Sequence, residues 1–93
     1  MNKPQVGIKL KVQFTKKAYK EFQKINKVNS KQFDQLFNAL KELEKNPYSN
    51  KYKTYKRNLQ FRRIRVGNYR ICFKIQQTDI IVVRVRKRDK VYD

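Results

Sequence analysis

Residues 61–75 constrain the fold more than any other stretch, because they have the pattern of two β-strands joined by a tight turn. Gly67-Asn68 suits the two central positions of a hairpin loop, in a type II′ or a type I′ turn. A two-residue loop also fixes the register of the two strands. The expected cross-strand pairs are Val66 with Tyr69, Arg65 with Arg70, Ile64 with Ile71, and Arg63 with Cys72.

Side chains alternate across these two strands and separate an apolar face from a cationic face. The residues expected on the apolar face are Ile64, Val66, Tyr69, Ile71, Phe73 and Ile75. Those expected on the opposite face include Arg63, Arg65, Arg70 and Lys74. We therefore expect one face to pack against the core and the cationic face, including Arg70, to meet solvent.

Residues 80–86 are β-branched and follow the polar segment 76–79, which predicts a third strand. A three-residue loop at 77–79 would keep Ile81, Val83 and Val85 on the apolar face, with Arg86 beside Arg70 and Arg84 beside Cys72. A row of arginines, Arg65–Arg70–Arg86, would then cross three strands. Like charges directly opposite one another are destabilising. Either these side chains are splayed and solvated, or a polyanion binds there.

The remainder of the chain predicts one strand and two helices. Residues 7–14 alternate as a half-buried strand, Thr15 is a plausible helix N-cap, and the first helix runs to about Asn26. Asn29 or Ser30 starts the second helix, which ends before Pro47. Its apolar stripe, expected in the core, is Phe33, Leu36, Phe37, Leu40 and Leu43.

The predicted fold is therefore α+β, with element order β-α-α-β-β-β in a single domain, residues 1–93. The last three strands form an antiparallel meander, and the helices form an αα-hairpin packed on its apolar face. The pattern does not fix where the first strand joins the sheet.

Charge points to a polyanionic partner. The chain has 25 Lys plus Arg against 7 Asp plus Glu, a formal net charge of +18. Such a charge favours nucleic acid or an acidic protein. All eight arginines lie between Arg57 and Arg88, so arginine is concentrated in the predicted sheet. Its planar fork suits phosphate better than a lysine ammonium does.

The absence of histidine limits the chemistry. Catalysis by a histidine acid or base is excluded, and we expect no metal and no cofactor. The single Cys72 excludes an internal disulfide, fits a reducing cytoplasm, and is interpreted as a packing residue.

No stretch approaches the roughly 20 apolar residues of a membrane span, and the first residues lack the apolar core of a signal peptide. A cytoplasmic protein without membrane contact is expected.

Residues 47–58 interleave tyrosines with cations, including Lys53 and Lys56. Aromatic rings among cations bind single-stranded nucleic acid by stacking on bases while the cations hold the backbone. The alternative is an ordinary polar loop with Tyr48, Tyr52 and Tyr55 at the domain edge.

Several motifs together resemble the RelE/ParE toxin superfamily. They are the block 63–70 (Arg-Ile-Arg-Val-Gly-Asn-Tyr-Arg), the apolar strand after it, the terminal segment 88–92 (Arg-Asp-Lys-Val-Tyr), and the opening segment 12–18. The resemblance covers nearly the whole chain and is closest to the RelE-like toxins. It implies the microbial-RNase type of fold, and an antitoxin partner with an acidic binding segment.

RelE-like members cleave messenger RNA on the ribosome through the RNA's own 2′-hydroxyl, which inhibits translation. Carried over by that resemblance, the catalytic residues are Arg63, Arg65, Arg70, Arg88 and Tyr92. Further RNA-binding residues are expected at Lys53, Lys56, Arg84, Arg86 and Lys87. Many relatives have a histidine where this chain has Lys87, so the group that accepts the 2′-hydroxyl proton stays open. Two alternatives remain: a ParE-like poison of DNA gyrase, and a non-catalytic RNA-binding or degenerate toxin.

Overall fold

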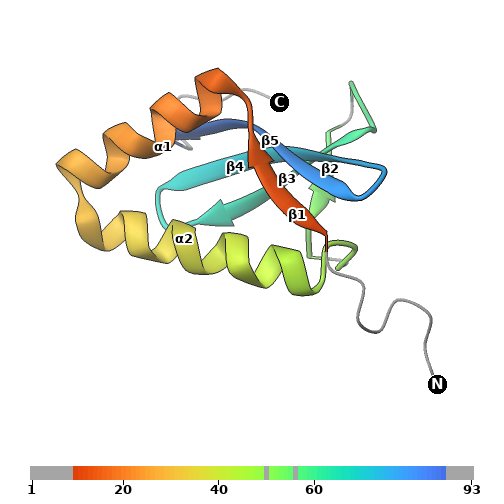
Figure 1. Cartoon of the computed structure of the whole chain (residues 1–93), viewed down its shortest axis with the longest axis horizontal. Helices are drawn as coiled ribbons and strands as arrows, with labels where there is room; N and C mark the ends of the chain where they lie inside the picture. Colours follow the sequence, from red (N-terminus) through yellow and green to blue (C-terminus); the bar gives the residue numbers. More distant parts are fainter. Residues whose placement is uncertain (1–9, 50, 56, 88–93) are drawn as a thin grey trace.

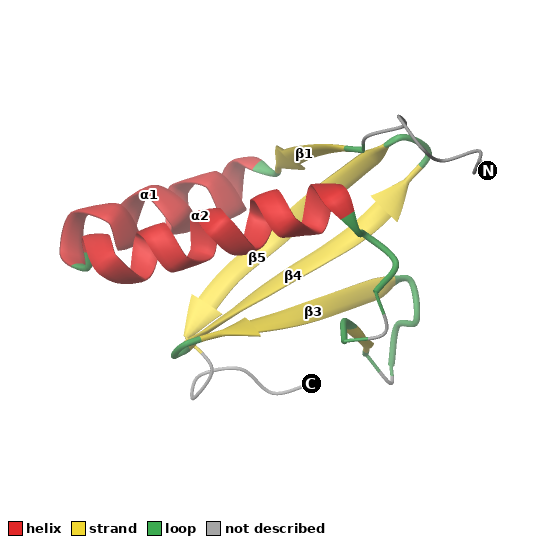
Figure 2. Ribbon diagram, turned by 90° about the horizontal axis from the view of Figure 1, so that it is seen from below, coloured by secondary structure: helices red, strands yellow, loops and turns green. Residues whose placement is uncertain are grey.

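The computed structural model describes residues 10–49, 51–55 and 57–87, which form two layers, with both helices on one face of a sheet (Figures 1 and 2). The elements in chain order are β1 (Lys11–Phe14), α1 (Lys16–Val28), α2 (Ser30–Lys45), β2 (Lys53–Thr54), β3 (Phe61–Val66), β4 (Tyr69–Gln76) and β5 (Asp79–Lys87). The predicted α+β fold is confirmed. The short β2 is an addition that the sequence pattern did not indicate.

Capping residues set both helix starts. The Thr15 hydroxyl accepts a hydrogen bond from the Ala18 amide at 3.1 Å, and the Asn29 side chain accepts one from the Gln32 amide at 3.0 Å. Each bond satisfies an amide that the first turn of a helix leaves without an intrahelical partner. The Thr15 cap is therefore confirmed, and Asn29 is the cap of α2.

The sheet has the strand order β1-β5-β4-β3-β2. β1 pairs in parallel with β5, from Lys11 opposite Asp79 to Phe14 opposite Val82. The other neighbouring pairs are antiparallel. Strand β1 is therefore an edge strand beside β5 (Figure 2), a position that the sequence pattern left open.

The central hairpin has the predicted register, with Val66 opposite Tyr69 and Arg65 opposite Arg70. Gly67 has a φ of +58°, whereas Asn68 does not adopt a positive φ. That combination belongs to a type II′ turn, which tolerates only glycine easily at its first central position. Of the two turn types considered, the structure therefore selects II′.

The β4–β5 connection differs from the prediction. It is a two-residue turn, with Gln76 paired to Asp79, so Ile80 and Val82 are buried where Ile81 and Val83 were expected. A β-bulge then leaves Val83 as an extra residue, because Cys72 pairs with Arg84 and Phe73 pairs with Val82. After the bulge, the residues from Arg84 onward have the predicted pairing, with Arg84 opposite Cys72 and Arg86 opposite Arg70.

The core lies between the helices and the sheet. Its fully buried large side chains are Phe73, Leu36, Leu43, Ile71, Ile80 and Val82. Phe37, predicted in the core, is instead 48% exposed. It lies at the rim of the apolar stripe, where it stacks on Phe33 and the Lys41 ammonium lies over its ring.

Substitutions in the two hairpin turns are expected to change stability in opposite directions. Gly67 and Gln77 have φ values of +58° and +56°, a region that costs a residue with a side chain about 1 kcal/mol. Gln77→Gly should raise the free energy of unfolding by about 0.5–1 kcal/mol. Gly67→Ala should lower it by at least about 1 kcal/mol, since the added Cβ would also lie 2.6 Å from the Gln32 Oε1 atom. Urea unfolding measures both, and shifts of the same sign would contradict the assigned turn geometry.

Candidate nucleic-acid interface

The predicted arginine row is present. Arg65 pairs with Arg70, and Arg70 pairs with Arg86, so three arginines lie side by side across β3, β4 and β5. A second row contains Lys53, Arg63, Cys72 and Arg84 across four strands. We call the sheet surface that carries these two rows the arginine face.

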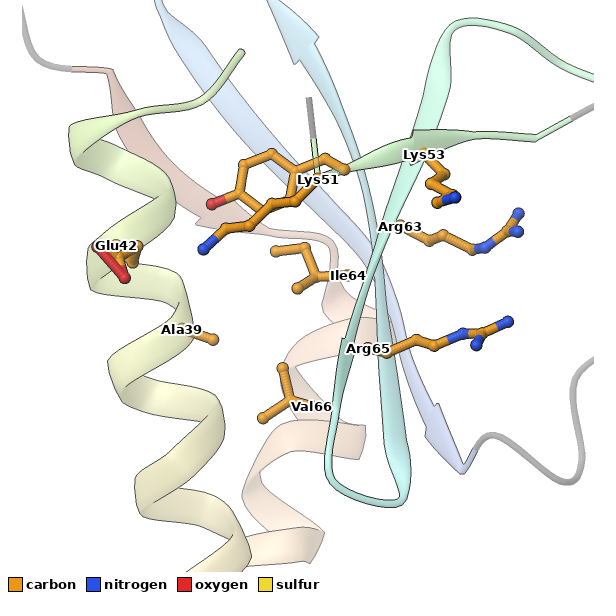
Figure 3. Close-up of a pocket in the computed structure, with 9 residues that line it drawn as sticks. Ala39, Glu42, Lys51, Lys53, Arg63, Ile64, Arg65 and Val66 are labelled. Atoms are coloured by element: carbon orange, nitrogen blue, oxygen red, sulfur yellow. The ribbon is translucent and has the colours of Figure 1, made fainter. Parts of the chain in front are cut away.

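The arginine face lies opposite the helices. In Figure 3, Lys53, Arg63 and Arg65 point away from α2, whereas Ile64 and Val66 point toward it. Strand alternation produces this separation, because Arg63 and Arg65 are two residues apart on one strand. The face therefore presents cations without helical cover, a geometry suited to a phosphodiester backbone.

Arg70 departs from its predicted exposure. Its side chain was expected in solvent, but the residue is only 8% exposed. It occupies the central strand of the sheet, where Arg65 and Arg86 flank it on both sides. Arg65, by contrast, is exposed. In the arginine row, Arg70 is therefore buried in the centre, whereas its neighbour Arg65 is accessible to a ligand.

Arg84, predicted to bind RNA, forms an ion pair across the layers. Its Nη2 atom lies 2.7 Å from Oε2 of Glu21 on α1, and its Nε atom also donates to that carboxylate. The hydrogen bond with Glu21 raises the pKa of Arg84. The Val85 amide donates to Glu21 Oε1 at 2.8 Å, where β5 extends beyond its pairing with β1. One carboxylate thus joins α1 to the end of β5.

Removing Glu21 is expected to destabilise the fold. The side chains of Glu21 and Arg84 are 23% and 31% exposed, so water screens this ion pair only partly. Glu21→Ala should lower the free energy of unfolding by about 2 kcal/mol, since it removes the charge partner and the acceptor of the Val85 amide. Glu21→Gln keeps an amide oxygen as acceptor, and should cost about half as much. Urea titrations compare the two, and equal values in wild type and Glu21→Ala would contradict this role.

The three tyrosines of the 47–58 segment have three different environments. Tyr52 is 5% exposed and packs edge-on against Phe73 with ring centroids 5.7 Å apart. Burial, and secondarily the carboxylate of Glu42, raises the pKa of Tyr52. The Arg63 guanidinium lies over the Tyr55 ring at 5.2 Å, and the Arg62 guanidinium lies 5.9 Å from the Tyr48 ring. Neither the base-stacking nor the edge-loop interpretation anticipated the buried Tyr52.

Some predicted site residues lie at or beyond the limits of the described structure. Lys87 is the exposed last residue of β5, opposite Tyr69. Lys56, Arg88 and Tyr92 lie outside the described residues, so their expected roles stay predictions.

A hollow that sequence reasoning missed lies between α2 and β3 (Figure 3). It has a volume of about 470 Å³. The residues that line it are Ala39, Glu42, Lys51, Tyr52, Lys53, Arg63, Ile64, Arg65 and Val66. Ile64 and Val66 point toward α2, whereas the side chains of Lys53, Arg63 and Arg65 point away from it (Figure 3). No sequence motif predicts this hollow, because its shape depends on how residues 51 and 52, just before β2, pack near α2 and β3.

The described residues contain no group of three or more His, Cys, Asp or Glu side chains that could hold a metal ion. Within the same residues, no helix is both long and apolar enough to cross a membrane. The chemistry that the arginine face offers is phosphate binding and stabilisation of negative charge.

Comparison with known families gives one sequence match. The family model for the ParE toxin of the type II toxin-antitoxin system, parDE, matches residues 12–92. A search of curated protein sequences finds no match.

Solved structures with a similar fold include toxins and toxin–antitoxin complexes. The YoeB/ParE toxin from Agrobacterium tumefaciens aligns with a TM-score of 0.74 at 10% identity, over 85% of this chain and 99% of that chain. A chain of the RelBE2 toxin-antitoxin complex from Mycobacterium tuberculosis gives 0.72 at 24% identity, over 87% and 100%. A chain of the archaeal RelE-RelB complex from Pyrococcus horikoshii OT3 gives 0.67 at 18% identity, over 88% and 98%. At these identities the likeness establishes the fold.

Proposed function

This chain belongs to the ParE toxin family of type II toxin–antitoxin systems, within the RelE/ParE superfamily, and we propose that it is an endoribonuclease that cuts messenger RNA on the ribosome. The observation that carries the proposal is the row Arg65–Arg70–Arg86 across three adjacent strands. Like charges directly opposite one another repel, and an RNA phosphate that binds among them reduces that repulsion.

The proposed reaction uses the 2′-hydroxyl of the RNA as nucleophile. The 2′-oxygen loses its proton and bonds to the adjacent phosphorus, which forms a 2′,3′-cyclic phosphate. The bond from phosphorus to the 5′-oxygen of the next nucleotide breaks, and that oxygen takes up a proton and leaves as a 5′-hydroxyl. Arg65 and Arg70 bind the phosphate oxygens and stabilise the charge that develops in the transition state. Arg63 and Arg86 bind the flanking backbone. Lys53, Lys56 and Lys87 add cationic contacts along the strand.

Proton transfer is assigned to the end of the chain by the family resemblance. Arginine is a poor base because its pKa exceeds about 12. We propose that Tyr92 stacks on a base or assists the proton transfer, and that Arg88 supports the phosphate. Arg84 is left out of the RNA contacts, since its guanidinium is bound to Glu21.

A second candidate is poisoning of DNA gyrase, and the ParE family match favours it. In that case the arginine face would have no reaction to catalyse. The two activities give different products in a translation extract that contains a supercoiled plasmid. The RNase proposal expects a shortened messenger and an intact plasmid, whereas gyrase poisoning expects a full-length messenger and broken DNA.

The antitoxin is expected to bind with an acidic segment. Several structural neighbours are toxin–antitoxin complexes, and this chain has a net charge of +18. We propose the hollow between α2 and β3 as part of the binding surface, because apolar side chains line it and cations lie beside it, which suits an amphipathic acidic segment. Within the described residues, β2 pairs only with Arg62 and Arg63, which leaves the outer edge of β3 from residue 64 to 66 beside that hollow.

A further inference from the structure

The contact between Tyr55 and Arg63 lies at the border of the arginine face. Lys53 of β2 pairs with Arg63 of β3, and Tyr55 follows Lys53 by two residues. Residues two apart in an extended segment share a face, which brings the Tyr55 ring to the side where Arg63 projects. The guanidinium lies 5.2 Å from the ring centroid, within the range of a cation–π contact.

Two contacts of the main fold fix the position of Tyr55. On its N-terminal side, the buried Tyr52 packs against Phe73 in the core and anchors the chain as it enters β2. At Tyr55 itself, the backbone amide donates a hydrogen bond to the Phe61 carbonyl at 3.1 Å. The ring is therefore part of the sheet border and not of a free loop tip.

Arg63 has a cationic neighbour that opposes any fixed orientation. Lys53 lies directly opposite it, and adjacent like charges favour splayed side chains. An arginine side chain also has many rotamers, and part of that conformational entropy is lost when it binds a phosphate. A ring that already holds the guanidinium reduces that loss.

We propose that Tyr55 is a positioning residue, whose ring holds the Arg63 guanidinium in place to bind a backbone phosphate on the arginine face. This inference rests on the proposed RNA-cutting function for its biological meaning. Tyr55 acts through Arg63 and through the face of its ring, so this role does not use its hydroxyl. Phenylalanine therefore replaces it, and leucine does not.

The chain supplies a matched control on the neighbouring residue. The Arg62 guanidinium lies 5.9 Å from the Tyr48 ring, in a similar contact. Arg62 and Arg63 point to opposite faces of β3, so this second pair lies away from the arginine face. Tyr48→Leu removes a ring from an arginine in the same way, without touching the proposed site.

The first experiment needs no RNA. The side-chain Nε–Hε signals of ¹⁵N-labelled protein are titrated with inorganic pyrophosphate, in wild type, Tyr55→Phe, Tyr55→Leu and Tyr48→Leu. Pyrophosphate should shift the Arg63 signal, with a Kd raised about 3–10-fold in Tyr55→Leu only, the cost expected for losing a contact of this kind. The Arg63 heteronuclear NOE should fall in the same variant. An Arg63 signal that behaves alike in Tyr55→Leu and wild type, or a Phe variant as impaired as Leu, would overturn the proposal.

The second experiment separates positioning from chemistry on programmed ribosomes. Tyr55→Leu should raise the KM for messenger cleavage about 3–10-fold, with kcat within about twofold of wild type. A fall in kcat with KM unchanged would overturn the positioning role. If wild type cuts no RNA, the proposed function fails, while the pyrophosphate titration still decides whether Tyr55 orients Arg63.

Discussion

Replacing Arg65 by alanine is expected to slow messenger cleavage by about 10²–10³-fold, the usual cost of removing one group that stabilises developing charge. Arg65 is the exposed neighbour of Arg70 in the arginine row. Because its side chain lies at the surface, the variant should keep the wild-type unfolding temperature. Single-turnover cleavage on programmed ribosomes measures the rate.

Arg62→Ala is the matched control for this variant. Arg62 lies on the same strand but faces the opposite side of the sheet. Arg62→Ala removes one positive charge, as Arg65→Ala does, so the general electrostatic attraction of the protein to RNA falls equally in both variants. Equal rates in Arg62→Ala and Arg65→Ala would show that only net charge matters, and the arginine face would lose its assigned role.

Arg70 requires a different substitution because it is largely buried. Arg70→Lys keeps the charge but loses the planar fork that binds two phosphate oxygens together. The same cleavage assay should therefore show a large loss in this variant, together with an unfolding curve that reports any damage to the sheet.

RNA binding should weaken steeply with salt. With four to six phosphate contacts and a slope of about −0.7 per contact for single strands, log K should fall by roughly 3–4 per tenfold increase in salt. The motivation is the alignment of Lys53, Arg63, Arg65, Arg70 and Arg86 on one surface. Fluorescence anisotropy with a labelled single-stranded RNA measures the slope.

The same titration on Arg65→Ala should give a slope smaller by about 0.7, since one phosphate contact is lost. Arg62→Ala should keep the wild-type slope. A wild-type slope near zero would mean that the face holds no polyanion, and would favour the gyrase-poison candidate.

The part of the fold that followed from sequence is the part set by local chemistry. Gly67-Asn68 determined a two-residue turn, and that turn determined the pairing of Arg65 with Arg70. Apolar spacing and the Thr15 cap placed the helices. These features depend on residues that are close together in the chain, so they can be predicted from the local sequence pattern.

The features that escaped prediction depend on contacts between distant residues. The two-residue turn after Gln76 places Ile80 and Val82 in the core, and the β-bulge at Val83 returns Arg84 to the arginine face; alternation alone indicates neither feature. Glu21 and Arg84 are 63 residues apart, so the alternation of side chains along β5 gave no indication of their ion pair. The parallel pairing of β1 with β5 likewise depends on tertiary contacts between distant segments of the chain.

The candidate site was predicted in its centre and not at its border. The arginine row followed from the hairpin register. The burial of Arg70, the anchoring of Tyr52 and the contact of Tyr55 with Arg63 required the packed structure. Each depends on what surrounds a side chain and not only on the face to which it points.

Primer extension on a messenger translated with purified wild-type protein decides whether this chain cuts messenger RNA. An endoribonuclease of the proposed kind produces new 5′ ends at defined codons of the translated region, which disappear in Arg65→Ala and persist in Arg62→Ala. A full-length messenger at saturating wild-type protein, in a reaction where the same protein leaves plasmid DNA broken by gyrase, would contradict that function.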